Sequence, residues 1–324
     1  MLDVEFQHIN FSYKNEKPLF NNLNLSFKKG DFCFVLGANG SGKTSLLKLL
    51  IGENKAQSGK ILFNNISIEK RSELTKLIGY IPQEQSLDHE MSVSDIIDFT
   101  ASFYFLNGTE LKIQKELLVT SLGIEALLQK KIKQVSGGQT QMVNVVLGLL
   151  HSPEIILLDE PFVGLDFEKT SKLIALLRTL NKTVICITHD LDVAEQYSDS
   201  ILIMKEGAIL EQGNPTEITE KNPFIFQEIE CKKLLQVNFP SEIKSEIFQN
   251  KITLSYLNKP KLTSLVNSFL EEQSGQILGL KTIKNTLKAS VIGLHHLSLA
   301  SEKVIVKKMG GGSGDGSGGG RNKN

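Results

Sequence analysis

The stretch Gly37-Ala38-Asn39-Gly40-Ser41-Gly42-Lys43-Thr44 decides the fold, because it joins a short apolar run to an amphipathic one. Residues 32–36 read as a buried strand, and residues 45–50, which begin with Ser45, carry the apolar stripe of a helix. The octapeptide fits the pattern G-x-x-x-x-G-K-[ST], in which glycines let backbone N–H groups converge on phosphate. The helix that follows adds its positive end. We therefore predict a phosphate-binding loop, with Lys43 on the β- and γ-phosphates and Thr44 on Mg²⁺.

Four short apolar runs, rich in β-branched or aromatic residues, set the fold class: 32–36, 155–158, 184–188 and 201–204. Continuous apolar runs of this length are typical of strands that are buried on both faces of a parallel sheet. Helical periodicity fills the gaps between them, and Ser92 with Asp95 forms a capping-box-like pair before one such stretch. The pattern predicts an α/β fold.

Two adjacent carboxylates, Asp159 and Glu160, follow the run at 155–158. Open α/β sheets bind ligands at the carboxyl ends of their strands, so we expect this pair beside the phosphate loop. Asp159 can hold Mg²⁺ through water, and Glu160 can act as general base on an attacking water. A capping pair after a core strand is the alternative interpretation of the same two residues.

Residues Val135-Ser136-Gly137-Gly138-Gln139 resemble the signature loop of the ATP-binding cassette (ABC) ATPases, usually written L-S-G-G-Q. Other markers of that family follow its usual order, namely Tyr13 at the adenine-stacking position, Gln83 in the Q-loop, Gly164-Leu165-Asp166 in the D-loop and His189 at the switch position. The resemblance covers roughly residues 1–220. It implies a P-loop NTPase cassette with a RecA-like core and a helical subdomain, which hydrolyses ATP with Mg²⁺.

The resemblance also implies a role for each matching residue. Glu160, His189 and Gln83 form the catalytic set, and Thr44, Gln83 and Asp159 hold the metal. The nucleotide-binding set comprises Tyr13, the loop from Gly37 to Ser45, the signature residues and the D-loop, that is Tyr13, Gly37, Ala38, Asn39, Gly40, Ser41, Gly42, Lys43, Thr44, Ser45, Ser136, Gly137, Gly138, Gln139 and Asp166. In the family the signature serves the γ-phosphate of a second subunit, which implies a nucleotide-dependent homodimer or a heterodimer with another ABC ATPase subunit.

The sequence departs from the usual family pattern at three positions. Met142 stands where Arg is common, Val163 stands where Ser is frequent in the D-loop, and Val135 replaces the first Leu of the signature. None of these changes removes a catalytic group. They indicate a less common subfamily.

Two segments are similar to those of ABC-2-type exporters: residues 91–106 and Pro161-Phe162-Val163-Gly164-Leu165-Asp166. This resemblance implies an ATPase subunit that acts at the cytoplasmic face of the membrane and powers a separate integral membrane permease, with export as the direction of transport. Residues 83–150 are the expected coupling surface. A soluble ABC mechanoenzyme, or a regulatory ATPase that is not coupled to transport, is the alternative, although sustained heptads and a second cassette are missing from the sequence.

Charge, hydropathy and cysteine content bear on which partners and which compartment we expect for this protein. Lys+Arg and Asp+Glu number 36 each, so the net charge is zero, and we expect no nucleic-acid partner. The longest apolar runs fall short of the roughly 18 residues that a membrane-spanning helix needs. Three scattered cysteines without C-x-x-C spacing indicate a reduced, cytoplasmic chain without a zinc framework.

The composition changes near residue 215 and again at 310, which predicts three parts. Residues 1–222 form the nucleotide-binding domain, residues 223–309 form an accessory or regulatory α+β module, and residues 310–324 form a Gly-rich disordered tail. Within the module we expect a strand at 252–256 and a further strand at 304–306. We also expect a helix from Pro260 to Gly275, with an apolar stripe made of Leu262, Leu265, Val266, Phe269 and Leu270.

Overall fold

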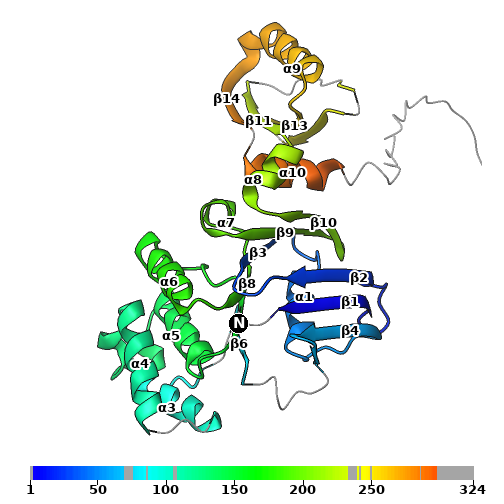
Figure 1. The fold of residues 1–324 in the computed structure, drawn as a ribbon. Coiled ribbons are helices and arrows are strands. Elements are labelled where there is room, and N and C mark those ends of the chain that lie inside the picture. The colour runs from blue at the N-terminus through cyan, green and yellow to red at the C-terminus, as the bar shows by residue number, and fades with distance from the viewer. Residues whose placement is uncertain are drawn as a thin grey trace, which may run out of the picture.

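The computed structural model describes residues 3–68, 76–84, 87–104, 108–232, 239–240, 242–248, 250–284 and 286–297 (Figure 1). Within these residues the chain forms three β-sheets with helices packed against them. The expected strand at 304–306 and the Gly-rich tail lie outside the described residues. Among the described residues, no helix is both long and apolar enough to cross a membrane.

The central sheet is mostly parallel, as the apolar runs predict. From one edge to the other its strands are β10 (Ala208–Gly213), β9 (Ser200–Lys205), β3 (Phe32–Leu36), β8 (Thr183–Ile187), β7 (Ile155–Asp159) and β6 (Ile78–Ile81). Every residue of β3, β7 and β8 is buried, because both faces of the sheet are covered. The four predicted strands are confirmed with shifts of one residue at an end, and β10 adds an antiparallel edge beside β9.

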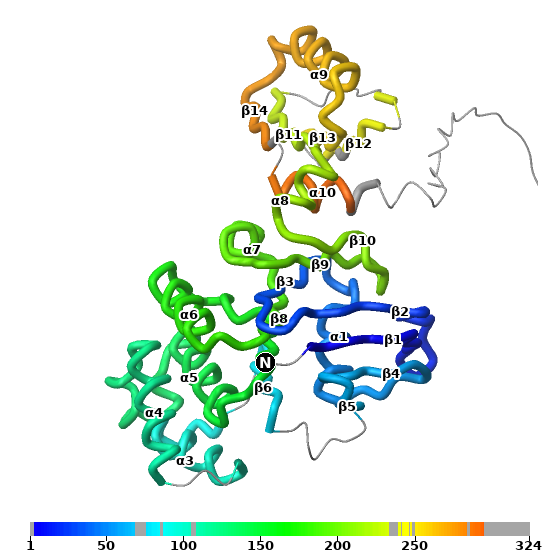
Figure 2. The backbone as a smooth tube through the Cα atoms, viewed as in Figure 1, coloured from blue at the N-terminus to red at the C-terminus, as the bar shows by residue number. Residues whose placement is uncertain are grey.

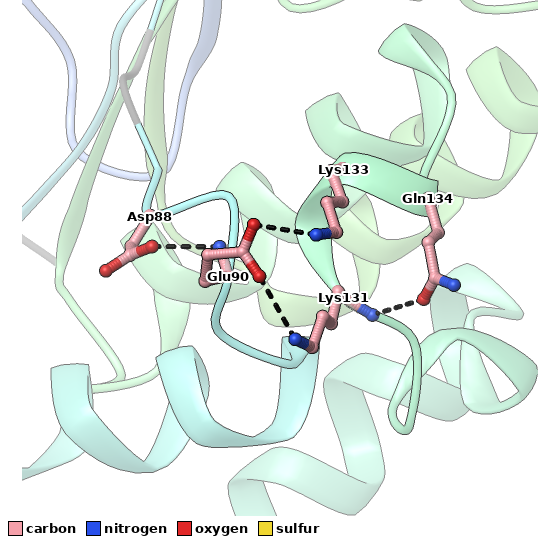
Figure 3. A network of polar contacts seen from close by, with 5 residues as sticks. All are labelled: Asp88, Glu90, Lys131, Lys133 and Gln134. Carbon is pink, nitrogen blue, oxygen red and sulfur yellow. Dashed lines mark hydrogen bonds and ion pairs between the residues drawn. The ribbon is translucent and has the colours of Figure 1, made fainter.

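An antiparallel sheet covers one side of this core. Its strands are, in order, β2 (Phe20–Phe27), β1 (Val4–Phe11), β4 (Ser58–Phe63) and β5 (Ile66–Ser67). Helix α1 (Lys43–Leu50) packs between the two sheets and buries Leu46, Leu47 and Leu50 there. Figure 2 shows α1 beside β1, β2 and β4. The start of α1, directly after the phosphate loop, is therefore fixed by packing on two sides.

Helices cover the other face of the central sheet. They are α3 (Val93–Phe103), α4 (Gly108–Leu122), the short 3₁₀ turns at Glu125–Leu127 and Ile132–Gln134, α5 (Gly137–Leu149), α6 (Phe167–Leu180), α7 (Leu191–Tyr197) and α8 (Pro215–Lys221). The predicted cap is confirmed, since the Ser92 hydroxyl accepts the Asp95 N–H and α3 begins at Val93. Phe32, Phe34 and Leu36 of β3 point into this helical layer, whereas Cys33 and Val35 point toward α1.

A C-terminal module follows α8. Its antiparallel sheet has the order β12 (Lys244–Phe248), β13 (Lys251–Leu257), β11 (Phe224–Cys231) and β14 (Ile277–Lys284), and its helices are α9 (Pro260–Glu272) and α10 (Leu287–Leu297), with a 3₁₀ turn at Ser274–Gln276. The strand expected at 252–256 is confirmed as β13. The expected helix begins at Pro260 but ends at Glu272, and Leu265 of its apolar stripe is 40% exposed.

Helix α10 returns to the N-terminal part of the chain. Leu287 and Val291 are buried in the same apolar cluster as Ala194 of α7 and Ile218 of α8. In Figure 1, α10 lies beside α8, between the module's sheet and the central sheet. The boundary predicted at 222/223 falls between α8 and β11, but α10 packs across this boundary.

Candidate functional site

The phosphate loop is held tightly by its neighbours. A Cβ at Gly37 would lie 2.4 Å from the Met204 carbonyl oxygen, and Gly42, with φ of 102°, would place a Cβ 3.1 Å from the Phe20 ring. The N–H of Gly207, in the turn between β9 and β10, donates to the Ser41 carbonyl at 2.9 Å. Glycine is needed at positions 37 and 42, because any side chain would collide or strain the backbone.

Lys43 is buried within this loop. Its Nζ donates to the carbonyl oxygens of Gly37 at 2.7 Å and of Ala38 at 3.1 Å. Burial lowers the pKa of the Lys43 amine, while the nearby Glu160 and Asp159 carboxylates act in the opposite direction. The Lys43 amine therefore lies against the backbone of the loop, where it can meet phosphate oxygens.

Oxygen-bearing side chains that suit Mg²⁺ meet at the end of β7. The Thr44 hydroxyl hydrogen-bonds the buried Asp159 carboxylate, and burial raises the pKa of Asp159 although this bond, Lys43 and other cations lower it. Gln83 lines the same cleft. Hydroxyl, carboxylate and amide oxygens are hard ligands of the kind that Mg²⁺ takes together with substrate phosphates, so these residues fit the ion. Described residues contain no group of three His, Cys, Asp or Glu that could hold a metal alone.

Glu160 and His189 face each other across the ends of β7 and β8. The Glu160 Oε2 accepts the backbone N–H of His189 at 3.2 Å, and the His189 Nε2 lies 3.1 Å from Oε1, without hydrogen-bond alignment. The Glu160 backbone has a φ of 51°, and its N–H donates to the Ile187 carbonyl. A non-glycine residue in this region is strained, and such strain is common where a side chain is aimed at a reaction.

Burial raises the pKa of the Glu160 carboxyl, while His189 and Lys43 oppose the shift. The Asp159 charge adds to it. A carboxylate with a raised pKa is a better proton acceptor than an exposed glutamate, which fits the general-base role expected for it.

These groups line one cleft of about 640 Å³. Its walls comprise Tyr13, Glu16, Lys17, Pro18, Leu19, Asn39, Gly40, Ser41, Gly42, Lys43, Thr44, Ser45, Gln83, Asp159, Glu160, Ile187, His189 and Glu206. Most of the predicted nucleotide and metal residues thus share one cavity. Gly37 and Ala38 contribute through the carbonyls that hold Lys43.

Tyr13 stands at the outer end of this cleft. Its hydroxyl lies 2.9 Å from the Ser45 Oγ, and its ring packs edge-on against Phe11 with centroids 5.0 Å apart. These contacts hold a partly exposed aromatic face beside the phosphate loop, as a base-stacking residue requires.

The sequence interpretation missed Glu16, Lys17, Leu19 and Glu206. Leu19 and Glu206 come together because the turn at 206–207 packs on residues 19–20, where a Cβ on Gly207 would lie 1.6 Å from the Leu19 carbonyl. No local motif marks such a long-range contact.

The signature residues and Asp166 lie outside the cleft of their own chain. Ser136 precedes α5, and its N–H donates to the Gln139 Oε1 at 3.1 Å. Asp166 caps α6 by accepting the Lys169 N–H at 2.9 Å, and it also pairs with the Lys169 amine. A Cβ at Gly138 would lie 2.5 Å from the Gly164 carbonyl, whereas Gly137 has open space around that position. Signature and D-loop therefore touch each other, and neither lines this chain's own cleft.

The raised pKa of Glu160 predicts a pH effect on stability. Because the folded state holds this proton more tightly than the unfolded state, the free energy of unfolding falls as pH rises through the folded pKa. Glutamine does not titrate, so Glu160→Gln avoids this loss of stability. Without nucleotide, the Tm of the variant minus the Tm of wild type should therefore increase as pH rises from about 4 to about 8. Calorimetry of both chains measures the difference. A Tm gap that stays constant or narrows with rising pH would contradict the burial of this carboxylate.

Comparison with known proteins gives consistent matches. The ABC transporter family model matches residues 20–163. The ergothioneine transport ATP-binding protein EgtV of Helicobacter pylori is 34% identical over 207 residues, which are 62% of this chain and 97% of that protein. A spermidine/putrescine import ATP-binding protein, PotA of Borrelia garinii subsp. bavariensis, is 35% identical over 223 residues, 66% of this chain and 63% of that protein.

A solved structure shares the fold of this chain. It is a dimeric ATP-binding cassette in a post-hydrolysis state, bound to ADP and Pi. It superimposes with a TM-score of 0.59 at 28% identity, and the match covers 65% of this chain and 98% of that one.

Proposed function

Because this chain belongs to the ABC transporter ATP-binding proteins, we propose that it hydrolyses ATP at sites shared between two such subunits, and so drives a separate membrane permease. ATP hydrolysis coupled to transport is the activity of the family. The observation that carries the proposal is the single cleft in which Lys43, Thr44, Asp159, Glu160 and His189 meet.

Each side chain in the cleft has a distinct task in this proposal. Lys43 binds the β- and γ-phosphates, and Tyr13 stacks on the adenine ring. Thr44, Asp159 and Gln83 would hold Mg²⁺, which supplies positive charge to the phosphate oxygens when it is bound. Glu160 orients the attacking water and accepts its proton. His189 contacts the γ-phosphate. The burial and backbone strain of Glu160, together with the raised pKa of its carboxyl, support its assignment as the base.

A second subunit would complete the site. Ser136, Gly137 and Gly138 offer phosphate donors at the start of α5 but do not line this chain's cleft. Beside the D-loop, Val163 is 64% exposed and Phe167 is 83% exposed. Exposed apolar side chains beside phosphate donors that serve no site in their own chain indicate a protein interface. Both a homodimer and a heterodimer with another ABC ATPase fit this surface.

The permease would dock on the helical subdomain, within the coupling surface expected at 83–150. Phe99 and Phe103 of α3 are 57% and 64% exposed, and their rings pack edge-to-face with centroids 5.1 Å apart. Ile113 and Leu117 of α4 are also exposed. Aromatic side chains that project from a soluble surface are common anchors of interfaces.

We expect Phe103→Ser to weaken binding of the permease by about 10-fold or more, the scale of an aromatic interface anchor. ATP binding to the isolated subunit should not change, because Phe103 lies outside the cleft. The measurement is co-purification of the two proteins from detergent-solubilised membranes. Leu278→Ser is the matched control, since Leu278 is equally exposed, at 61%, but lies on the C-terminal module. If both variants lose permease binding to the same extent, the helical subdomain is excluded as the docking surface.

The direction of transport separates two versions of this proposal. Residues 91–106 and 161–166 predict an exporter, but the comparisons do not support that subtype, and PotA is named for import. Import therefore has the stronger support. Transport into vesicles of known orientation, reconstituted with the permease and ATP, distinguishes the two. A subunit that acts from the cytoplasmic face fits either direction.

The second candidate function is a soluble ABC mechanoenzyme or a regulatory ATPase. The exposed Phe99–Phe103 pair fits a partner protein in either case, and the transport proteins EgtV and PotA, to which this chain is similar, favour a membrane partner. Failure of any membrane protein to co-purify, together with ATP turnover by the subunit alone, would favour the alternative.

A further inference from the structure

Helix α10 has two apolar sides, and each packs on a different part of the protein. Ala289 and Gly293 face β11 of the module, where a Cβ on Gly293 would lie 2.2 Å from the Phe224 ring. Leu287 and Val291 are buried instead against the N-terminal part of the chain. Residues four apart lie on one side of a helix, so α10 connects the two parts with opposite faces.

Helix α7 is one of the elements that α10 contacts, and α7 begins at Leu191, two residues after His189. The Asp190 carboxylate caps α7 by accepting the N–H groups of Asp192 and Val193. The helix has seven residues, of which Ala194 is the buried one. So short a helix is marginal by itself, because most helical stability in proteins comes from tertiary packing. The position of α7 therefore depends on its neighbours.

A side chain of α7 also binds the first turn of α10. The Glu195 Oε1 accepts the Leu287 N–H at 3.2 Å, at the end of α10 where N–H groups lack intrahelical partners. A carboxylate is favourable at this positive end of a helix. Leu287 thus contributes a buried side chain to the cluster around α7 and a backbone donor to Glu195.

The His189 ring contacts the Glu160 carboxylate, with 3.1 Å between Nε2 and Oε1. Its side chain is 51% exposed, and its backbone N–H donates to Glu160. The backbone that carries this ring joins β8 to α7, so the start of α7 is one of the elements that set where the ring lies.

We propose that Leu287 and Glu195 are positioning residues for His189, through which the C-terminal module supports ATP hydrolysis but not ATP binding. The inference rests on the proposed role of His189 at the γ-phosphate. It also gives the module a part in the chemical step, beyond the accessory or regulatory role expected from the sequence.

The test measures kcat and KM for ATP in full-length chains. Leu287→Ala removes the buried side chain, and a displaced His189 should lower kcat by about 10-fold to 100-fold, the scale of small misplacements in an active site. KM should stay near the wild-type value, because Tyr13 and the phosphate loop are untouched. Leu287→Met, which keeps most of the volume, should restore kcat. In a His189→Ala background, Leu287→Ala should cause no further loss, because the two residues act through one step.

Leu254→Ala is the matched control, since Leu254 is equally buried but belongs to the module's own core. Its kcat should equal that of wild type. If Leu287→Ala does not fold, the exposed Glu195→Ala variant replaces it, with Glu195→Gln as the conservative rescue. An unchanged kcat in the folded variant, an equal loss with Leu254→Ala, or a full additional loss on top of His189→Ala would overturn the inference. An unchanged kcat in His189→Ala alone would instead overturn the proposed role of His189.

Discussion

Glu160→Gln is expected to lower steady-state ATP turnover by at least about 100-fold, the scale of a lost general base. The amide keeps the shape of the carboxylate and can still accept the His189 N–H, but it cannot take a proton from water. ATP and Mg²⁺ should still bind, because Lys43, Thr44 and Asp159 are unchanged. Phosphate release measures turnover, and equilibrium binding of a fluorescent ATP analogue measures affinity.

Glu154→Gln controls for the substitution itself. Glu154 precedes β7, at the opposite end of the strand from Glu160, and pairs with the Lys182 amine at 2.6 Å. Its loss should leave turnover near the wild-type value. Near-normal hydrolysis by Glu160→Gln would show that another group activates the water.

Gly137→Asp is expected to abolish both ATP-dependent dimerisation and hydrolysis. In the composite site, the new carboxylate would face the γ-phosphate held by Lys43 of a second subunit, and the two like charges would repel in a water-poor interface. The isolated chain should fold normally, because no atom lies within 4 Å of a Cβ at this position. A negative charge is also favourable in the first turn of α5.

Sedimentation with Mg-ATP in a Glu160→Gln background measures the dimer directly. Gly137→Ala is the control, since it occupies the same open space without adding charge. It should keep more of the dimer than Gly137→Asp does. A dimer that persists with Gly137→Asp would exclude the signature loop from the shared site.

Local signals allowed much of the fold and the cleft to be predicted from the sequence. The strand β3, the phosphate loop and the carboxylates at the end of β7 each depend on a few neighbouring residues, so their motifs can be recognised in the sequence alone. The Ser92 cap was predictable for the same reason. Burial on both faces of the parallel sheet then follows from continuous apolar runs.

Contacts between distant segments could not be predicted in this way. Leu287 and Val291 look like the apolar stripe of any helix, and nothing near them in the sequence indicates that they pack beside α7 and α8. In the sequence Met142 is only a departure from the family pattern, whereas in the structure it is buried in the helical core. Glu206 reaches the cleft through the fold of the turn at 206–207. Each depends on tertiary packing, which overrides local pattern.

The close approach of Gly138 to Gly164 bears on cooperativity between the two ATP sites of a dimer. Gly138 would face the second subunit's γ-phosphate, while Gly164 follows this chain's own Glu160 by four residues. A Cβ at Gly138 would lie 2.5 Å from the Gly164 carbonyl oxygen, so the two backbones are packed too closely to move independently. Loss of phosphate at one site would therefore shift the segment that follows Glu160 at the other site. In a homodimer, symmetry makes this effect mutual. Communication between the sites would then need no side chain at all, only two glycines in contact.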